Sequence, residues 1–193
     1  MSISSFVKKV SMGSAGAAFI ALGIAGTAQA ATFNEVGDAG QTLGTAKSLG
    51  NGITQINGTR DGDDPDLYSF FWNGGTFSAD TLGSSLFDTQ LFLFDSDGLG
   101  VIANDDGGFP FPDVFRSGFS INLSQGLYYL GITEFNSDPF SSGGTIFAGG
   151  FGSDQTPTGP GGALPLNGWS AASTSGGSYQ INISGTAAVP EPA

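Results

Sequence analysis

The sequence predicts an all-β protein, an antiparallel β-sandwich or jelly roll of about eight short strands. Apolar and polar residues alternate with period two in several windows, which is typical of strands that bury one face. Clusters of Gly, Asn, Asp and Pro separate these windows at regular intervals, as in sandwich folds. Beyond the first thirty residues, no window has the 3.6-residue period of a helix.

The first thirty residues have the layout of a secretory signal peptide. Lys8 and Lys9 precede an apolar run over about 13–28, and Ala28-Gln29-Ala30 is an A-x-A cleavage site. A membrane anchor is the alternative, but the run is short and rich in Gly, Ala and Ser. We therefore expect cleavage after Ala30, export to the cell surface, extracellular space or periplasm, and no stable transmembrane anchor.

The strands expected in the first half of the mature chain are short. Residues 31–41 form an extended lead-in, and Gly50-Asn51-Gly52 is a hairpin signal between two apolar runs. The next strand carries Tyr68, Phe70 and Trp72 on one face at period two. The expected strands are 45–49, 53–58, 66–72 and 76–82.

The central stretch, 88–106, predicts a β-hairpin. Two apolar runs, 91–94 and 101–103, flank a turn-rich link that contains Asp-Gly, a strong hairpin signal. With residues 95–100 as the link, Phe94 pairs with Val101, Phe92 with Ala103 and Gln90 with Asp105. This register places Asp88 beside Asp105 and Asp106 at one end of the hairpin, with Asp95 and Asp97 at the other.

The second half predicts three further strands and one insertion. Residues 119–124 and 127–133 alternate around a Gln-Gly turn, and 178–184 resumes the alternation. In 141–177, 24 of 37 residues are Gly, Ser, Thr or Pro, which indicates a long loop or mobile flap inserted before the last strand. We expect one domain over 31–187, followed by a tail at 188–193.

Charge and composition exclude several classes of function. Loss of residues 1–30 removes two lysines and takes the net charge from −12 to −14, so we exclude nucleic-acid binding. The chain has no cysteine and therefore no disulfide. It has no histidine, which excludes Ser-His-Asp catalysis and the usual zinc sites. Any metal would be a hard cation bound by oxygen, with calcium first.

Two groups of acidic residues are candidate calcium ligands. Four carboxylates fall within six residues, and they repel one another unless solvated or bridged by a cation. The hairpin register supplies a second or shared site. The alternative for both groups is a solvated acidic turn. The candidate ligands are Asp61, Asp63, Asp64, Asp66, Asp88, Asp105 and Asp106.

Four segments resemble the bacterial pre-peptidase C-terminal domain. The first two, Asp64-Pro-Asp66-Leu-Tyr68-Ser-Phe70 and Asp88-Thr-Gln-Leu-Phe-Leu-Phe-Asp95-Ser-Asp97-Gly98, are similar to its D-x-D-x-Y-x-F and D-T-x-L-x-L-[YF]-D-x-D-G motifs. Asn104-Asp-Asp106 and Gly126-Leu-Tyr-Tyr-Leu130 resemble its N-D-D and G-x-Y-Y-L segments. The resemblance implies a jelly-roll-like sandwich, usually a non-catalytic accessory of secreted enzymes, and in some members a matrix-binding or calcium-binding module.

The chain departs from that family at both ends of the module. No peptidase domain precedes it, and the insertion 141–177 resembles versions in exported proteins with the PEP-CTERM sorting signal. Val189-Pro-Glu-Pro192 resembles the opening motif of that signal, but the hydrophobic span and basic tail are absent from the sequence.

The sequence favours a non-catalytic module of the cell surface or extracellular matrix. Its expected partner is an extracellular polysaccharide or a matrix or cell-surface protein. The alternatives are an accessory of a secreted peptidase and a carboxylate-dependent hydrolase, although the acids lie in polar turns that give no sign of a raised pKa. Aromatic residues outside the strands either form a binding platform or, as we favour, plug the open ends of the sandwich. These aromatics are Phe109, Phe111, Phe115, Phe140, Phe147, Phe151 and Trp169.

Overall fold

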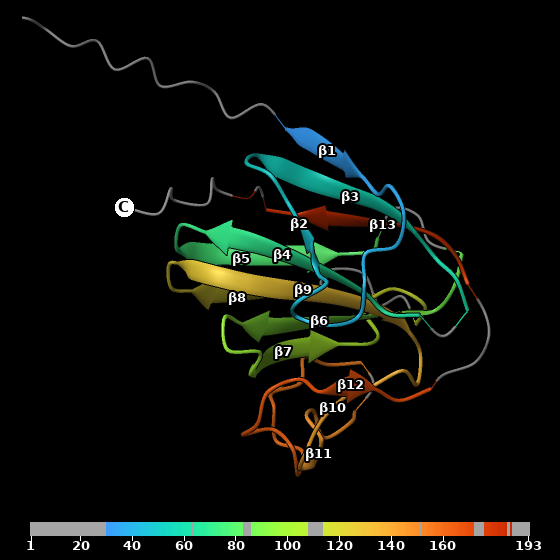
Figure 1. The fold of residues 1–193 in the computed structure, drawn as a ribbon, viewed down its shortest axis with the longest axis vertical. Helices are drawn as coiled ribbons and strands as arrows, with labels where there is room; N and C mark the ends of the chain where they lie inside the picture. The colour runs from blue at the N-terminus through green and yellow to red at the C-terminus, as the bar shows by residue number, and fades with distance from the viewer. Residues whose placement is uncertain are drawn as a thin grey trace, which may run out of the picture.

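The computed structural model describes residues 30–62, 64–82, 86–107, 114–150, 152–171, 176–184 and 186. Within these residues the chain is all-β, and two five-stranded sheets pack face to face (Figure 1). Sheet A has the order β1 (Ala31–Asn34), β3 (Ile53–Arg60), β13 (Gly177–Ile183), β5 (Gly75–Asp80) and β8 (Gly118–Leu123). Sheet B has the order β2 (Lys47–Ser48), β4 (Asp66–Trp72), β9 (Gly126–Glu134), β6 (Thr89–Asp95) and β7 (Gly100–Asn104). The predicted β-sandwich is confirmed.

The core lies between the two sheets and uses the faces that alternation predicted. Sheet A contributes Phe77, Phe119, Tyr179 and Ile181, and sheet B contributes Tyr68, Phe70, Leu91 and Leu93. Phe70 and Phe77 stack across the core with ring centroids 4.9 Å apart. Because side chains alternate between the faces of a strand, every second residue of each run enters this layer.

Most consecutive strands lie in opposite sheets, which overturns one sequence prediction. Gly50-Asn51-Gly52 does not close a hairpin, because β2 belongs to sheet B and β3 to sheet A. The chain crosses the sandwich at this point. Two short edge pairs, β1 with β3 and β2 with β4, are parallel, whereas the other pairs are antiparallel.

The central hairpin of β6 and β7 is present, with one change in register. Phe92 pairs with Ala103 as predicted, but Phe94 pairs with Gly100 because the register shifts between Leu93 and Phe94. The turn is fixed by Asp95, whose Oδ1 accepts hydrogen bonds from the backbone N–H groups of residues 97 and 99 at 3.0 and 2.9 Å. Asp95 therefore stabilises the turn, as expected of Asp-Gly links.

The insertion packs against the sandwich and forms a third sheet. It contributes β11 (Gly144–Thr145) and β12 (Gly168–Trp169), which pair with β10 (Pro139–Ser141) in the order β11-β10-β12. Phe147 and Trp169 pack against Phe92 and Phe94 on the outer face of sheet B. Most of the described residues of the insertion lie outside strands, as expected of a long loop, and the segment packs on sheet B through Phe147 and Trp169.

The loop aromatics cover a face of the sandwich, where the sequence predicted plugs at its open ends. The run Leu91 to Phe94 is apolar at every position, so both faces of β6 need a cover, and the insertion supplies the second one. Phe115 differs from Phe147 and Trp169, since 57% of its surface is exposed. Phe109, Phe111 and Phe151 lie outside the described residues.

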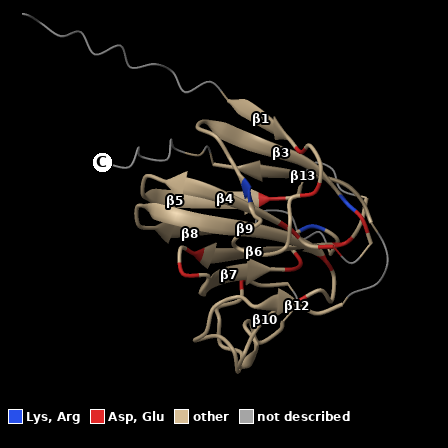
Figure 2. Cartoon of the chain, in the orientation of Figure 1, with Lys and Arg blue, Asp and Glu red and all other residues tan. Residues whose placement is uncertain are grey.

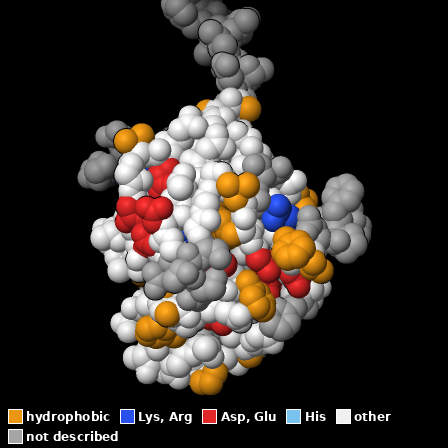
Figure 3. All heavy atoms as spheres, turned by 90° about the vertical axis from the view of Figure 1, so that its right-hand side faces the viewer, with side chains coloured by type: hydrophobic (Ala, Val, Ile, Leu, Met, Phe, Trp, Pro, Cys, Tyr) orange, Lys and Arg blue, Asp and Glu red, His pale blue; other side chains and the backbone are white. Residues whose placement is uncertain are grey.

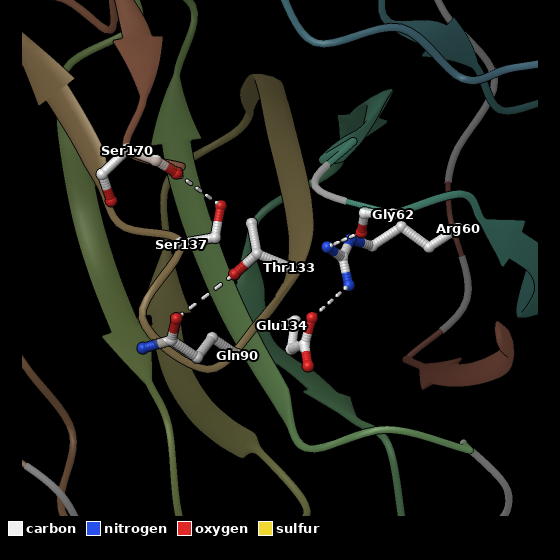
Figure 4. A network of polar contacts seen from close by, with 7 residues as sticks. All are labelled: Arg60, Gly62, Gln90, Thr133, Glu134, Ser137 and Ser170. Carbon is white, nitrogen blue, oxygen red and sulfur yellow. Dashed lines mark hydrogen bonds and ion pairs between the residues drawn. The ribbon is translucent and has the colours of Figure 1, made fainter. Parts of the chain in front are cut away.

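Polar contacts hold the end of β9 to its neighbours (Figure 4). Glu134 Oε2 pairs with the buried guanidinium of Arg60 at 3.5 Å, and Arg60 also donates to the carbonyl of Gly62. Ser137 Oγ donates to the carbonyl of Ser170 at 3.0 Å, which ties the insertion to the segment after β9. Thr133 Oγ1 donates to the Gln90 side chain at 3.4 Å. These bonds fix the end of the sandwich where the acidic loops lie.

Candidate functional site: two carboxylate clusters at the loop end

The first cluster joins carboxylates from two separate parts of the chain, the lead-in and the segment that enters β4. Oxygen atoms of Asp38, Asp64 and Asp66 lie within 4.8 Å of one another. Asp66 begins β4 and is 1% exposed, whereas Asp38 and Asp64 are carried by loops. Oxygens bound to one Ca²⁺ at about 2.3–2.6 Å lie up to about 5 Å apart across the ion. The three carboxylates therefore have the spacing of a calcium ligand set.

Glu35 adds a fourth carboxylate to this region. The parallel pairing of β1 with β3 brings the Glu35 backbone N–H to the carbonyl of Asn57 at 2.9 Å, and Glu35 Oε2 accepts from the Thr59 N–H at 2.9 Å. Glu35 Oε1 is buried and has no hydrogen-bond partner in the described part of the chain. A hollow of about 700 Å³ adjoins this region, and its lining includes Glu35, Asp38, Asp61 and Tyr179.

Asp66 is held by a buried pair of tyrosines. The Tyr179 hydroxyl donates to Asp66 Oδ2 at 2.5 Å, and the Tyr68 and Tyr179 hydroxyls are hydrogen-bonded at 2.6 Å. Burial is the main cause that raises the pKa of Asp66, to about 8, against the lowering effect of the Tyr179 hydrogen bond. Repulsion from Glu35, Asp38 and Asp64 raises this pKa further.

The neighbouring acids are shifted in the same direction. Burial raises the pKa of Glu35 and of Asp64, and the proximity of Asp38 adds to both shifts. Two ionised carboxylates 4.8 Å apart repel by about 3–4 kcal/mol at an effective dielectric constant of about 20. A divalent cation among them would reverse this effect, because it favours the ionised form of each ligand.

The second cluster lies at the open end of the central hairpin. Asp88 precedes β6, and Asp105 and Asp106 follow β7, so that carboxylate oxygens of the three residues lie within 4.8 Å of one another. The predicted neighbourhood of Asp88 with the two later acids is confirmed. Burial raises the pKa of Asp105 to about 7, and repulsion from Asp106, Asp88 and Asp138 adds to the shift.

The structure separates the candidate ligands into two groups and adds residues that the sequence did not single out. Asp61 lines the hollow beside the first cluster but is not one of its three members, and Asp63 lies outside the described residues. Asp38 and Glu35 were not predicted as site residues. In sheet B, Asp66 pairs with Ile132, Ile132 with Leu91, and Leu91 with Asn104, the residue before Asp105. Neighbouring strands lie about 4.8 Å apart, so these three steps separate the two clusters by about 14 Å. One shared ion is therefore excluded for the described carboxylates.

Both clusters lie on the same end of the sandwich. Acidic residues are concentrated in the loops on the right of Figure 2. Seen from that side, the surface carries two separate acidic groups with hydrophobic side chains exposed between and beside them (Figure 3). Leu86, Val114 and Phe115 are the most exposed large apolar residues near the second cluster, at 77%, 61% and 57%. The Phe115 carbonyl accepts from the N–H of Thr89, the residue after Asp88, at 3.4 Å.

No protein-family model matches the chain, and no curated protein matches it. Among solved structures, the chain is similar to the pre-peptidase C-terminal domain of a collagenase from Bacillus anthracis, at 14% identity and a TM-score of 0.42, over 72% of this chain and 93% of that one. It is also similar to a periplasmic inhibitor of g-type lysozyme from Aeromonas hydrophila, at 11% identity and a TM-score of 0.31, over 79% of this chain and 96% of that one. Among the described residues, no helix has the length and hydrophobicity needed to span a bilayer.

Proposed function

We propose that the protein is a non-catalytic, exported binding module of the cell surface or extracellular matrix. Bound Ca²⁺ would stabilise the end of the sandwich that carries the two carboxylate clusters. The observation that carries the proposal is the convergence of Asp38, Asp64 and Asp66, with oxygens within 4.8 Å of one another. Asp38 comes from the lead-in, whereas Asp64 and Asp66 lie 26 and 28 residues later, in the acidic loop and at the start of β4. An ion bound among them would fix the lead-in, the acidic loop and β4 relative to one another.

The geometry favours a cation site over a catalytic pair of acids. Glycoside hydrolysis places two carboxyl groups about 5–9.5 Å apart across a cleft that a sugar can enter. Asp66, whose pKa burial raises to about 8, is 1% exposed and accepts a hydrogen bond from the Tyr179 hydroxyl at 2.5 Å. A polysaccharide chain cannot contact a carboxyl group that is buried to this extent. Among the described residues that line the adjacent hollow, Tyr179 is the only aromatic one. The hollow therefore has little aromatic surface on which a sugar ring could stack.

The partner that we propose is an extracellular polysaccharide or a matrix or cell-surface protein. With its net charge of −12 over the full sequence, the protein would meet an anionic partner through bound Ca²⁺. The exposed side chains of Leu86, Val114 and Phe115 offer apolar contacts at the same end. The calcium ions and these side chains together would form the binding surface.

Thermal melts test the calcium part of the proposal. An ion that binds only the folded form stabilises it by about 2.7 kcal/mol at a hundredfold excess over its dissociation constant. For a chain of this size this corresponds to a rise in Tm of roughly 5–11 °C. We expect this rise with millimolar CaCl₂ but not with NaCl of equal ionic strength, and a smaller rise with MgCl₂ because Mg²⁺ keeps its waters.

Two variants of equal charge change provide the control. Asp64→Asn should reduce the calcium-dependent rise in Tm, whereas Asp97→Asn, at an exposed position outside both clusters, should keep the full rise. Equal melting temperatures in CaCl₂ and matched NaCl would show that the acids are only a solvated surface. Cleavage of a panel of glycans or of casein by the purified protein, abolished by an Asp→Asn change, would refute the non-catalytic assignment.

A further inference from the structure

We propose that Asp105, together with Asp88 and Asp106, forms a second and independent Ca²⁺ site at the open end of the β6–β7 hairpin. Carboxylate oxygens of the three residues lie within 4.8 Å of one another, as at the first cluster. The inference does not require the first cluster to bind an ion, since the two groups are separated by strands β9 and β6. It rests on the burial of Asp105 without a hydrogen-bond partner among the described residues, and on the backbone contacts that hold the three acids.

Asp105 is a buried carboxylate whose two oxygens accept no hydrogen bond from the described residues. The residue is 5% exposed, and neither Oδ1 nor Oδ2 has a hydrogen-bond partner in the described part of the chain. A buried polar group without a partner costs about 1–3 kcal/mol, and an ionised one costs more. The side chain lines a small cavity of about 80 Å³, which also includes Gln90 and Asp138 in its lining. Among the described residues, nothing offsets the cost of burying this carboxylate, and a bound ligand would do so.

The surrounding charges indicate that this ligand is a cation. Asp106, Asp88 and Asp138 all act on Asp105 as like charges. A water molecule could accept or donate hydrogen bonds at Asp105, but it would bring no positive charge to offset the three like charges that act on this carboxyl group.

The backbone around the cluster holds the three acids in place. Asn104, the last residue of β7, accepts from the Gly118 N–H at 2.9 Å and donates to Asp154 at 3.1 Å. The N–H of Gly107 donates to the Arg116 carbonyl at 2.9 Å. Asp105 and Asp106 therefore lie between two anchored residues, Asn104 and Gly107. The Asp88 carbonyl accepts from the N–H of Phe135 at 3.0 Å. Ligands on strand ends held in this way need little reordering when an ion binds.

Calcium is the cation that fits this ligand set. The three side chains offer only carboxylate oxygen, which suits hard cations and not the transition metals that prefer nitrogen or sulfur. Asp88 and Asp106 are half-buried, so solvent reaches one side of the cluster. Ca²⁺ accepts six to eight oxygens in flexible geometry, and waters on the open side would complete its coordination.

Calorimetric titration of the purified protein with CaCl₂ tests the proposal. We expect two equivalents for the unmodified protein, one equivalent after Asp105→Asn, and two after Asp97→Asn, the exposed control of equal charge change. The Ca²⁺ affinity of the second site should fall by more than about tenfold. Substitution of residues that only support metal ligands already costs about 10-fold to 100-fold in affinity, and Asp105 would be a ligand itself. Asp106→Asn, at a half-buried position, provides a second variant should Asp105→Asn not fold.

A thermal melt of the same variants distinguishes a cation site from a buried neutral acid. In EDTA, Asp105→Asn should melt higher than the unmodified protein because it removes a like charge, and in CaCl₂ it should show a smaller calcium-dependent rise. The Asp64→Asn variant separates this inference from the proposed function. If it alone abolishes calcium binding, and the Asp105→Asn and Asp106→Asn variants titrate like the unmodified protein, the second site is refuted and the first stands. If Asp105→Asn alone abolishes binding, the second site stands and the first is refuted.

Discussion

The stability of the metal-free protein should fall as the pH rises from about 5 to 6.5. The pKa of Asp66 is raised to about 8 and that of Asp105 to about 7, whereas an unfolded Asp has a pKa of about 3.9. The folded protein therefore keeps two protons that the unfolded chain has lost in this range. Because the folded form binds more protons, its free energy of unfolding decreases as the pH rises.

The size of the effect follows from the number of protons. Each retained proton lowers the free energy of unfolding by about 1.4 kcal/mol per pH unit. Two protons over 1.5 pH units give a loss of at most about 4 kcal/mol, a large part of the about 5–15 kcal/mol that stabilises a typical domain. Glu35, Asp64 and Asp138 have pKa values raised by burial, so they change stability in the same direction.

Urea unfolding in EDTA at several pH values measures this loss. Asp66→Asn should reduce the slope by about half, because one of the two retained protons is gone, and an Asn oxygen still accepts the hydrogen bond from Tyr179. Asp97→Asn should leave the slope unchanged. Saturating Ca²⁺ should flatten it, since a bound ion keeps its ligands ionised. A free energy of unfolding in EDTA that is equal or larger at pH 6.5 than at pH 5 would refute the reasoning.

Three further substitutions, one of them with a matched control, test individual contacts of the fold by urea unfolding. Trp169→Ala should cost about 2–4 kcal/mol, since its ring lies 5.6 and 6.0 Å from two Phe rings of sheet B; unchanged stability would mean that the insertion does not stabilise the sandwich. Gly58→Ala places a Cβ 2.3 Å from the Tyr179 hydroxyl and should cost about 1–3 kcal/mol, whereas Gly44→Ala, with nothing within 4 Å, should change stability by less than about 0.5 kcal/mol. Glu134→Gln removes the charge that faces a buried guanidinium at 3.5 Å and should cost about 3 kcal/mol; a loss below about 1 kcal/mol would contradict the role of this ion pair.

The local pattern of the sequence was sufficient to predict the two layers of the core. Alternation at Tyr179, Ile181 and Ile183 placed these side chains inward, and all three are buried in the core. The hairpin register also placed Asp88 beside Asp105, because the pairing depends only on residues close in sequence. Predictions succeeded where short-range geometry decides the structure.

The outer cover of sheet B needed a signal of a different kind. An uninterrupted apolar run such as Leu91 to Phe94 indicates a strand buried on both faces, so a covering element could have been expected from the sequence. Which segment supplies that cover depends on tertiary packing. Ile146 and Phe147 stand in a Gly-rich stretch without periodicity, and nothing local marks them as core residues.

The first cluster was predicted only in part for a related reason. Asp64 and Asp66 were found from the crowding of acids in one loop, but Asp38 comes from the lead-in, 26 residues before Asp64 in the printed sequence. Its position depends on the parallel pairing of β1 with β3, a contact between edge strands that leaves no short-range pattern. The hairpin signal at Gly50–Gly52 was misleading, because the chain crosses between sheets there.

A crystal structure of the protein grown in CaCl₂ is the most direct test of the central claim. The account predicts a strong density peak among the carboxylates of Asp38, Asp64 and Asp66, with oxygen distances of about 2.3–2.6 Å and an anomalous signal consistent with calcium. If these side chains instead point away from one another, with only water between them at millimolar Ca²⁺, the loop end is not a calcium site.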